Sequence, residues 1–362
     1  MRAWTCMLAI CAGSVSVAET RLSGLQSEAV PVGSANCSDL AVKTRGARLR
    51  RALEGGFGVQ YWGEGYSADS LAAQPHGLLI IEVAKVGAQY SDTGREMFFS
   101  VDEMNRISRD GARPVLSYLN VGEIETYRDY WIEALAEIGS AETGSLPIWY
   151  GPHYGQDDRL AAYWMPQWHD LLLARVDRLM QSGASGVFLD DVLQYFSHAA
   201  ETGLDWPSGT RPEGPRTAPE LARAMMRLVT RIAERVRAWD CEALVVVNNA
   251  AFIGRDAAEG AEGDGSSPGF DAYRAAIDAI MAENALVSPE HATTRTVLTE
   301  DYLDAGIPVL TLDVLPDHGA EDWADRRQEL AARAIDAGFA PYLVDDAIFN
   351  RLAAPVLLPG KS

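Results

Sequence analysis

Acidic and amide side chains stand at the ends of several apolar runs of this sequence. They are Glu82, Glu123, Glu125, Asp190, Asp191, Asn248, Asn249, Glu283 and Asp313. An Asp or Asn in such a position often caps the following helix, and capping is the simpler explanation of any one of them. Capping explains less well why so many runs end alike. If the runs are parallel strands of a barrel, their ends converge on the face where barrel enzymes do their chemistry.

Glycosidic cleavage is one chemistry that such a set could perform. It requires two carboxylic groups facing each other across the bond, one ionised and one able to give a proton. Asp190 directly follows Val187-Phe188-Leu189, and Glu283 ends the run 277–282 in the same manner, so both are candidates among the strand-end acids. Aromatic residues that could stack on sugar rings, or simply pack in the core, are Trp62, Tyr118, Trp149, Tyr150, Trp164 and Trp168.

Other chemistries have less support in the sequence. The six His residues show no HExxH or other tight ligand spacing, so a catalytic zinc is not indicated. No G-x-S-x-G elbow provides a hydrolytic serine. Cys37 precedes the first predicted strand and Cys241 precedes an apolar one, which does not favour a cysteine nucleophile. We therefore expect no metal ion and no organic cofactor.

The elements that must position these groups alternate between strands and helices. The strand candidates are residues 57–62, 77–83, 113–121, 146–150, 185–192, 243–250, 276–284 and 307–314. Residues 165–183 and 219–239 carry apolar side chains at helical spacing. Eight strands alternating with helices predict an α/β fold, a single-domain (β/α)8 TIM barrel over residues 51–355. Two insertions, 202–218 and 254–269, each follow a strand and would enlarge the mouth of the barrel.

The N-terminal residues predict export. Residues 1–18 combine Arg2, a short apolar stretch and Ser16-Val17-Ala18, the pattern of a signal peptide. Residues 19–50 are polar and end in a basic run, which indicates a flexible lead-in without a core of its own. Cys37 and Cys241 remain after the leader; they are either a disulfide or two separate thiols. A secreted or periplasmic protein is expected.

The charge balance restricts the partners. The formal net charge is −20, which argues against nucleic acid and anionic membranes because both require a basic surface. It permits a cationic ligand. No later segment is apolar for long enough to span a bilayer.

The run VLSYLNVGEIETYRDYW at 115–131 resembles the Y-[LI]-[SN]-V-G-E-x-E-x-Y-R-x-Y-W signature of glycoside hydrolase family 114. The similarity continues, in order, through residues 163–179, 183–192, 245–250, 277–286, 308–314 and 338–344. The family resembles endo-α-1,4-polygalactosaminidases, which cut chains of amino sugars on a TIM-barrel scaffold. One departure follows the sixth predicted strand, where relatives have Gln-Asn and then an acid but this chain has Asn248-Asn249-Ala250-Ala251.

The resemblance implies roles for individual residues. Asp190 matches the family's catalytic Asp, as nucleophile or charge stabiliser, and Glu283 its catalytic Glu, as general acid/base. Glu123, Tyr118 and the Tyr127-Arg128 pair match its pocket signature. The full set expected to bind substrate is Tyr61, Glu82, Tyr118, Asn120, Glu123, Tyr127, Arg128, Trp164, Asp191, Asn249 and Asp313.

Three functions remain open at this stage. The first is hydrolysis of an α-linked amino-sugar polysaccharide, possible without a cofactor and compatible with an acidic cleft. The second is a catalytically silent barrel that binds polysaccharide of the cell envelope. The third is a glycosidase of different linkage specificity that processes exopolysaccharide.

Overall fold

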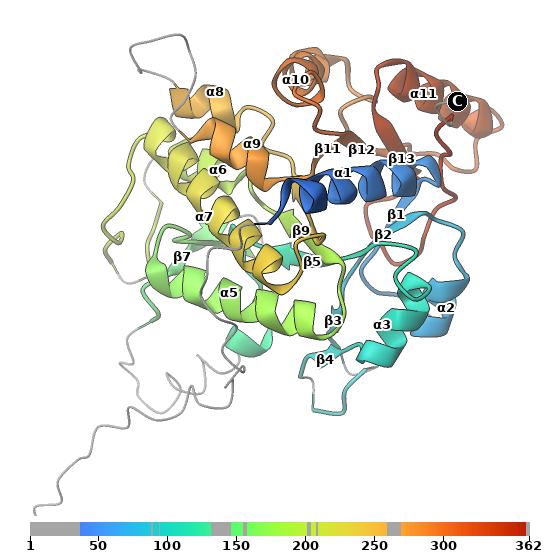
Figure 1. The fold of residues 1–362 in the computed structure, drawn as a ribbon. Coiled ribbons are helices and arrows are strands. Elements are labelled where there is room, and N and C mark those ends of the chain that lie inside the picture. The colour runs from blue at the N-terminus through green and yellow to red at the C-terminus, as the bar shows by residue number, and fades with distance from the viewer. Residues whose placement is uncertain are drawn as a thin grey trace, which may run out of the picture. The chain divides into compact units, whose positions relative to one another are not determined.

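Eight parallel strands form one sheet with helices around it (Figure 1). The structure is a computed structural model that describes residues 37–87, 90–93, 95–131, 146–154, 158–200, 204–207, 209–258 and 269–359. In sheet order the strands are β1 (Phe57–Gln60), β2 (Leu78–Ile81), β5 (Val115–Asn120), β9 (Gly186–Asp190), β10 (Leu244–Asn248), β11 (Ala279–Glu283), β12 (Val309–Val314) and β13 (Ala340–Val344). The predicted TIM barrel is confirmed, in a nearly closed form.

Side chains close the seam between the first and last strands. Tyr342 of β13 donates a hydrogen bond to the carbonyl of Val59 in β1 at 3.5 Å, and its ring centroid lies 5.3 Å from that of Phe57.

Among the described residues, no helix is long and apolar enough to cross a membrane.

The outer layer consists of helices that follow the strands. They are α2 (Ala68–Ala73), α3 (Val101–Ser108), α5 (Pro166–Gln181), α6 (Gln194–Ala200), α7 (Ala218–Trp239), α8 (Ile253–Ala258), α9 (Phe270–Ala276), α10 (Ala292–Val297) and α11 (Trp323–Asp336), with a 3₁₀ turn at Pro289–His291 and a π-helical turn at Leu298–Leu303. The two predicted long helices are α5 and α7. Thr217 and Glu220 form a capping box at the start of α7, which fixes where this helix begins.

Strand alternation divides the apolar residues into two cores. In β2, Leu78 and Ile80 belong to the barrel interior, while Leu79 and Ile81 pack against the helices. Successive side chains of a strand point to opposite faces, so a strand covered on both sides must be apolar throughout. This explains the continuous runs LLII and LVVV.

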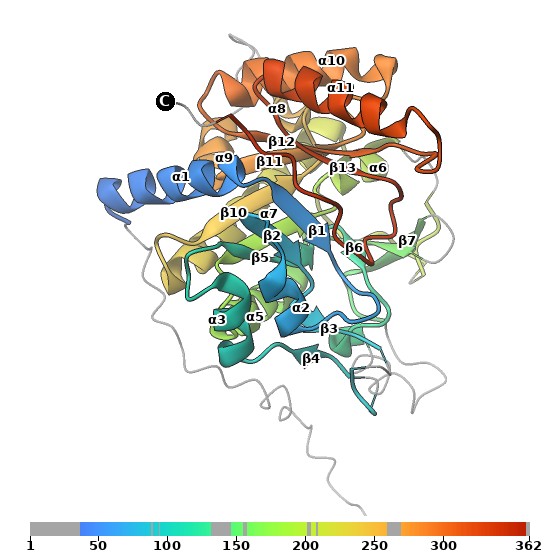
Figure 2. The same cartoon turned by 90° about the vertical axis from the view of Figure 1, so that its right-hand side faces the viewer.

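Residues 39–50, predicted to be part of a flexible lead-in, instead form most of helix α1 (Asp39–Glu54), so that prediction is wrong for them (Figure 2). Ser38 caps the helix, and its buried Leu49 and Leu53 join the interior core. The helix was hard to predict from the sequence because its basic residues outnumber the few apolar ones that pack against the barrel. The signal-peptide segment 1–18 and residues 19–36 lie outside the described residues.

Helix α1 contacts segments that directly precede barrel strands, which places it over their N-terminal ends. Arg45 is buried and forms an ion pair with Asp278 at 2.5 Å, just before β11, and also donates to the carbonyl of Cys241 at 2.9 Å. Cys37 and Cys241 form a disulfide with a Cα–Cα distance of 5.5 Å. Of the two alternatives left open for these cysteines, the structure has the bridge.

The predicted strand at 146–150 is not a barrel strand. Its last residue begins β7 (Tyr150–Tyr154), which pairs with β8 (Asp158–Ala161) and through it with β6 (Glu123–Ile124) in a small antiparallel sheet. A second small pair consists of β3 (Ala84–Lys85) and β4 (Met97–Phe98). The eighth barrel strand is β13, which the strand prediction did not include. Of the predicted insertion 254–269, residues 254–258 belong to α8 and 259–268 lie outside the described residues.

Candidate active site

The alternation along the strands brings three polar side chains together at the carboxyl end of the barrel. Phe188, Val246 and Met281 belong to the interior core. Two residues farther along the same strands stand Asp190, Asn248 and Glu283, which therefore also face the interior. The same parity in β1, β2 and β5 places Tyr61, Glu82, Tyr118 and Asn120 on this side.

Asn248 joins the two acids. Its amide nitrogen donates to Asp190 Oδ1 at 2.8 Å and to Glu283 Oε1 at 2.6 Å. Because both oxygens contact this one nitrogen, they lie no farther apart than about 5.4 Å. Asn248 was recognisable from the sequence as a strand end but was not among the predicted site residues. Residues 244–248 read LVVVN and show no alternation of polar and apolar side chains, so the local sequence contains no signal that could have placed Asn248 beside the acids.

The two carboxyl groups differ in how many hydrogen bonds they accept. Asp190 accepts from Asn248, from the backbone N–H of Asp191 at 2.9 Å and from the Tyr118 hydroxyl. Burial raises the pKa of Asp190, and these three hydrogen bonds oppose the rise. Burial also raises the pKa of Glu283, and the charge of Asp190 raises it further, while the bond from Asn248 alone opposes. Glu283 is thus the less well stabilised carboxylate of the two.

Two tyrosines lie beside the acid pair. The ring centroids of Tyr61 and Tyr118 are 4.7 Å apart. Burial raises the pKa of the Tyr61 hydroxyl well above its usual value, and the charges of Asp190 and Glu283 add to the rise. Burial and the charge of Asp190 do the same for Tyr118. Both hydroxyls remain protonated and are available as hydrogen-bond donors.

A cavity of about 410 Å³ opens beside these tyrosines. It is lined by Tyr61, Trp62, Glu82, Val86, Tyr118 and Tyr127. Trp62 is 46% exposed, yet its indole N–H donates to the carbonyl of Ile348 at 3.1 Å, which fixes the ring in place. Flat aromatic faces and a carboxylate therefore surround this cavity.

Arg128 supports the cavity from behind. It is 1% exposed and binds three carboxylates: Glu82 at 2.5 Å, Glu125 at 2.9 Å and Glu96 at 3.2 Å. Burial raises the pKa of Glu82, and the guanidinium of Arg128 opposes this. The position of Arg128 makes it a structural support for Glu82, and the Tyr127 hydroxyl in turn donates to Glu125.

A second polar cluster flanks Asp190. The Asn120 amide donates to Asp191 and its oxygen accepts the backbone N–H of Glu123 at 2.8 Å. Gln194 donates to the carboxylates of both Glu123 and Asp191. Burial, followed by the charges of Asp190 and Glu123, raises the pKa of Asp191 well above its usual value. These residues adjoin the acid pair through Asp191.

Three residues of the expected binding set have other positions. Asp313 is 0% exposed, and its Oδ1 accepts the N–H of Leu286 at 2.7 Å, so it secures the loop after β11. Asn249 accepts the N–H of Glu283 at 3.1 Å and so holds the end of β11. Trp164 packs in an aromatic cluster with Trp206 and lies under the guanidinium of Arg211, 4.2 Å from its ring centroid. The structure does not bring Asp313 or Trp164 into the set around the acid pair.

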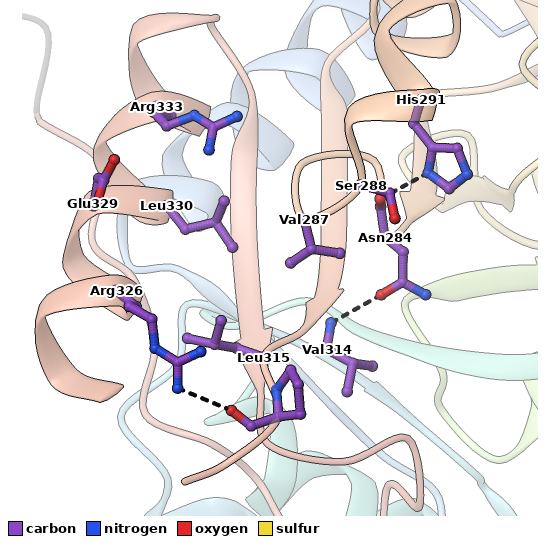
Figure 3. Close-up of a pocket in the computed structure, with 11 residues that line it drawn as sticks. Asn284, Val287, Ser288, His291, Val314, Leu315, Arg326, Glu329, Leu330 and Arg333 are labelled. Carbon is purple, nitrogen blue, oxygen red and sulfur yellow. Dashed lines mark hydrogen bonds between the residues drawn. The ribbon is translucent and has the colours of Figure 1, made fainter. Parts of the chain in front are cut away.

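A second cavity, of about 680 Å³, lies between α11 and the loop after β11. The side chains of Leu330 and Arg333 point from α11 toward the loop that carries Val287, whereas Arg326 donates to the carbonyl of Pro316 at 3.3 Å (Figure 3). Asn284, which follows Glu283, lines this cavity, but its side chain accepts the N–H of Val314 at 3.1 Å. The acid pair is not part of this lining.

Comparison with known proteins identifies the family. The sequence profile described as glycoside-hydrolase family GH114 matches residues 93–353, most of the chain. The chain belongs to family GH114. The matched region includes four of the barrel strands that carry the site, β5, β9, β10 and β11, and both members of the acid pair.

Similar solved structures have the same barrel fold. The Aspergillus fumigatus protein Ega3, in a complex with galactosamine, covers 84% of this chain and 96% of its own at 13% identity and a TM-score of 0.54. The glycoside hydrolase domain of PelA from Pseudomonas aeruginosa covers 82% and 96% at 16% identity and a TM-score of 0.51. An uncharacterised protein of Deinococcus radiodurans is 27% identical over 314 residues, 81% of this chain and 84% of that protein.

Proposed function

We propose that this GH114 protein is an exported, retaining glycoside hydrolase that cleaves an α-linked amino-sugar polysaccharide with Asp190 and Glu283. The observation that carries the proposal is the single amide nitrogen of Asn248, which contacts both acids and holds Asp190 Oδ1 and Glu283 Oε1 within about 5.4 Å of each other. Retaining glycosidases place the two carboxyl groups about 5–5.5 Å apart, and inverting ones about 6.5–9.5 Å apart. The separation supports a double displacement.

The hydrogen bonds support the division of roles. Asp190, with three donors, is the better stabilised anion and suits the nucleophile. Glu283 is buried, faces the charge of Asp190 and accepts one side-chain hydrogen bond, so it suits the group that keeps a proton. Environments that push the pKa values of two carboxyl groups apart are how such pairs divide acid and nucleophile.

The reaction then proceeds in two steps. Asp190 attacks the anomeric carbon while Glu283 gives its proton to the glycosidic oxygen; the C–O bond breaks and an ester joins Asp190 to the sugar. Glu283, now ionised, takes a proton from water as the water oxygen attacks the same carbon. This releases the sugar with its configuration retained and returns both carboxyl groups to their starting states.

The cavity next to the acid pair supports an amino sugar. Tyr61, Trp62, Tyr118 and Tyr127 provide aromatic faces that stack on sugar rings and attract cations, and Glu82 adds a carboxylate. The net charge of −20 also favours a cationic polymer. The similar Ega3 structure has galactosamine bound, which agrees with this choice.

Two features support export. The first 18 residues have the pattern of a signal peptide. The disulfide between Cys37 and Cys241 is a bond that persists in oxidising compartments.

The test compares cleavage of partly deacetylated galactosaminoglycan by the wild type, Glu283→Gln and Asp190→Asn, with α-glucans and galactans as alternative substrates. We expect cleavage of the amino-sugar polymer by the wild type alone, and ¹H NMR of the first product should show the α-anomer. Glu329→Gln, on the exposed side of α11, is the matched control and should remain active. Binding without cleavage would favour a silent barrel, and an initial β-anomer would contradict the retaining mechanism.

A further inference from the structure

Asn248 occupies an unusual position between the two acids. It is 2% exposed, and both of its amide hydrogens are used, one toward Asp190 and one toward Glu283. Its Oδ1 atom is buried and has no hydrogen-bond partner within the described part of the chain. The amide therefore serves the two carboxylates through its nitrogen alone.

The backbone holds this amide at a fixed place relative to Glu283. Asn249, the next residue, has a φ of 57°, a left-handed conformation that Asn tolerates better than most residues. Its side-chain oxygen accepts the N–H of Glu283, and its own N–H donates to the carbonyl of Met281 at 2.7 Å. On the other side, Val247 pairs in register with Leu189, the residue before Asp190. The strand ends that carry the three side chains are thus held to one another.

We propose that Asn248 is a positioning residue, which holds Asp190 and Glu283 at the separation needed for double displacement and stabilises the ionised form of each. The inference rests on the proposed function, because it assigns no role to Asn248 apart from the acid pair. It adds a third side chain to the reaction, one that need not touch the substrate.

The groups around the two acids determine what the loss of this amide would do. Asp190 faces the Asp191 N–H, the Tyr118 hydroxyl and the charges of Glu125 and Glu283. It would therefore keep two of its three donors. Glu283 faces the charge of Asp190, and the Tyr61 hydroxyl lies near both acids. Glu283 would lose the one side-chain hydrogen bond that opposes the rise of its pKa.

This asymmetry gives a distinctive pH dependence. Removal of a donor to an ionised carboxylate raises the pKa of the carboxyl group. The acid limb of kcat/KM reports Asp190, which must be ionised, and the alkaline limb reports Glu283, which must hold its proton. Both limbs should move to higher pH in the variant, and the alkaline limb should move farther. A purely structural role would lower the rate and leave both limbs in place.

The decisive variant is Asn248→Leu, which keeps the approximate shape of the side chain and removes the two N–H bonds. Since Oδ1 has no partner, no other hydrogen bond is lost. We expect kcat/KM on partly deacetylated galactosaminoglycan to fall about 100-fold at the wild-type optimum, the scale of a disturbed acid–base pair, and to recover in part at higher pH. Asn105→Leu, on the exposed side of α3, is the matched control and should keep the wild-type pH profile.

A second variant and a second measurement make the test independent of folding and of activity. Asn248→Asp keeps the shape and packing but replaces the shared donor by a carboxylate, so it should also move the limbs upward. ¹³C NMR titration of the Asp190 and Glu283 carboxyl groups needs no substrate, and we expect both to titrate at higher pH in either variant. A wild type that cleaves no polymer would overturn the proposed function, whereas unchanged carboxyl titrations or unmoved limbs would overturn the role of Asn248.

Discussion

Arg128 provides a positive charge to three acidic side chains beside the cavity. It forms ion pairs with Glu82, Glu96 and Glu125 at one place, and removal of one partner from a buried ion pair typically lowers stability by about 3–5 kcal/mol. We therefore expect Arg128→Met to lower the free energy of unfolding by about that amount in urea titrations.

The control for this prediction is an exposed arginine with similar pairing. Arg351 is paired with Asp345 and Asp346 at 2.8 Å but is mostly exposed. Arg351→Met should change stability by less than about 1 kcal/mol, as exposed pairs do. Equal effects of the two substitutions would show that the buried cluster contributes no more than a surface pair.

The buried carboxyl group of Glu283 should lower the free energy of unfolding at neutral pH, because its ionisation is less favourable in the folded chain than in the unfolded one. The raised pKa of Glu283 means that the folded chain holds this proton more tightly than the unfolded chain does. Stability therefore falls as pH rises through the interval between the unfolded and folded pKa values, and it stays lower above them. Glu283→Gln removes this loss. We expect the variant to be more stable at pH 7 by on the order of 1 kcal/mol, the equivalent of one pKa unit.

The dependence on pH distinguishes this effect from a packing change. The gain in stability should disappear below about pH 4, beneath the unfolded pKa of a Glu side chain near 4.3. Thermal unfolding of both proteins over a pH series measures it. A variant that is no more stable than the wild type at pH 7 would contradict the explanation.

At the scale of elements, helix α1 was not predicted from the sequence, yet it contributes buried residues to the core of the barrel. Leu49 is 0% exposed and belongs to the interior core, so Leu49→Ala should lower the free energy of unfolding by about 2–5 kcal/mol. Leu40 lies on the same helix but is 73% exposed, and Leu40→Ala should change stability by no more than about 0.5 kcal/mol. Urea unfolding of the two variants provides the comparison, and similar effects would argue against α1 as part of the core.

Seven of the eight barrel strands could be predicted from the sequence, and one could not. Seven barrel strands were predictable because their runs are apolar on both faces, as parallel strands must be. The strand β13 was missed because its sequence APYLV is short and contains a proline, which is unfavourable inside a strand. The segment 146–150 is apolar and aromatic, as a strand would be, but it leads into a small antiparallel side sheet instead.

The candidate site was predictable only in part, for a related reason. Asp190 and Glu283 could be found because each ends an apolar run, and family resemblance selected them. Asn248 required the register between three neighbouring strands, which depends on long-range pairing rather than on local pattern. Asp313 has the same local pattern as Glu283 but the opposite strand parity, and so it faces the helical layer.

At the scale of the whole molecule, the negative charge should govern how the substrate arrives. A net charge of −20 creates a field that attracts a cationic polymer and raises its association rate. Salt shortens the reach of that field from about 10 Å at 0.1 M to about 3 Å at 1 M. We therefore expect kcat/KM for a deacetylated, cationic galactosaminoglycan to fall at least about tenfold over this range, within the span of steering effects.

The fully N-acetylated polymer separates this field effect from any effect of salt on the enzyme itself. It has the same backbone but carries no ammonium groups, so its kcat/KM should change little between the two salt concentrations. Initial-rate measurements on both polymers, at a pH where the acid pair is fully active, give the comparison. If salt weakened cleavage of both polymers equally, the acidic surface would have no part in substrate capture, and the choice of substrate would depend on the cavity beside the acid pair alone.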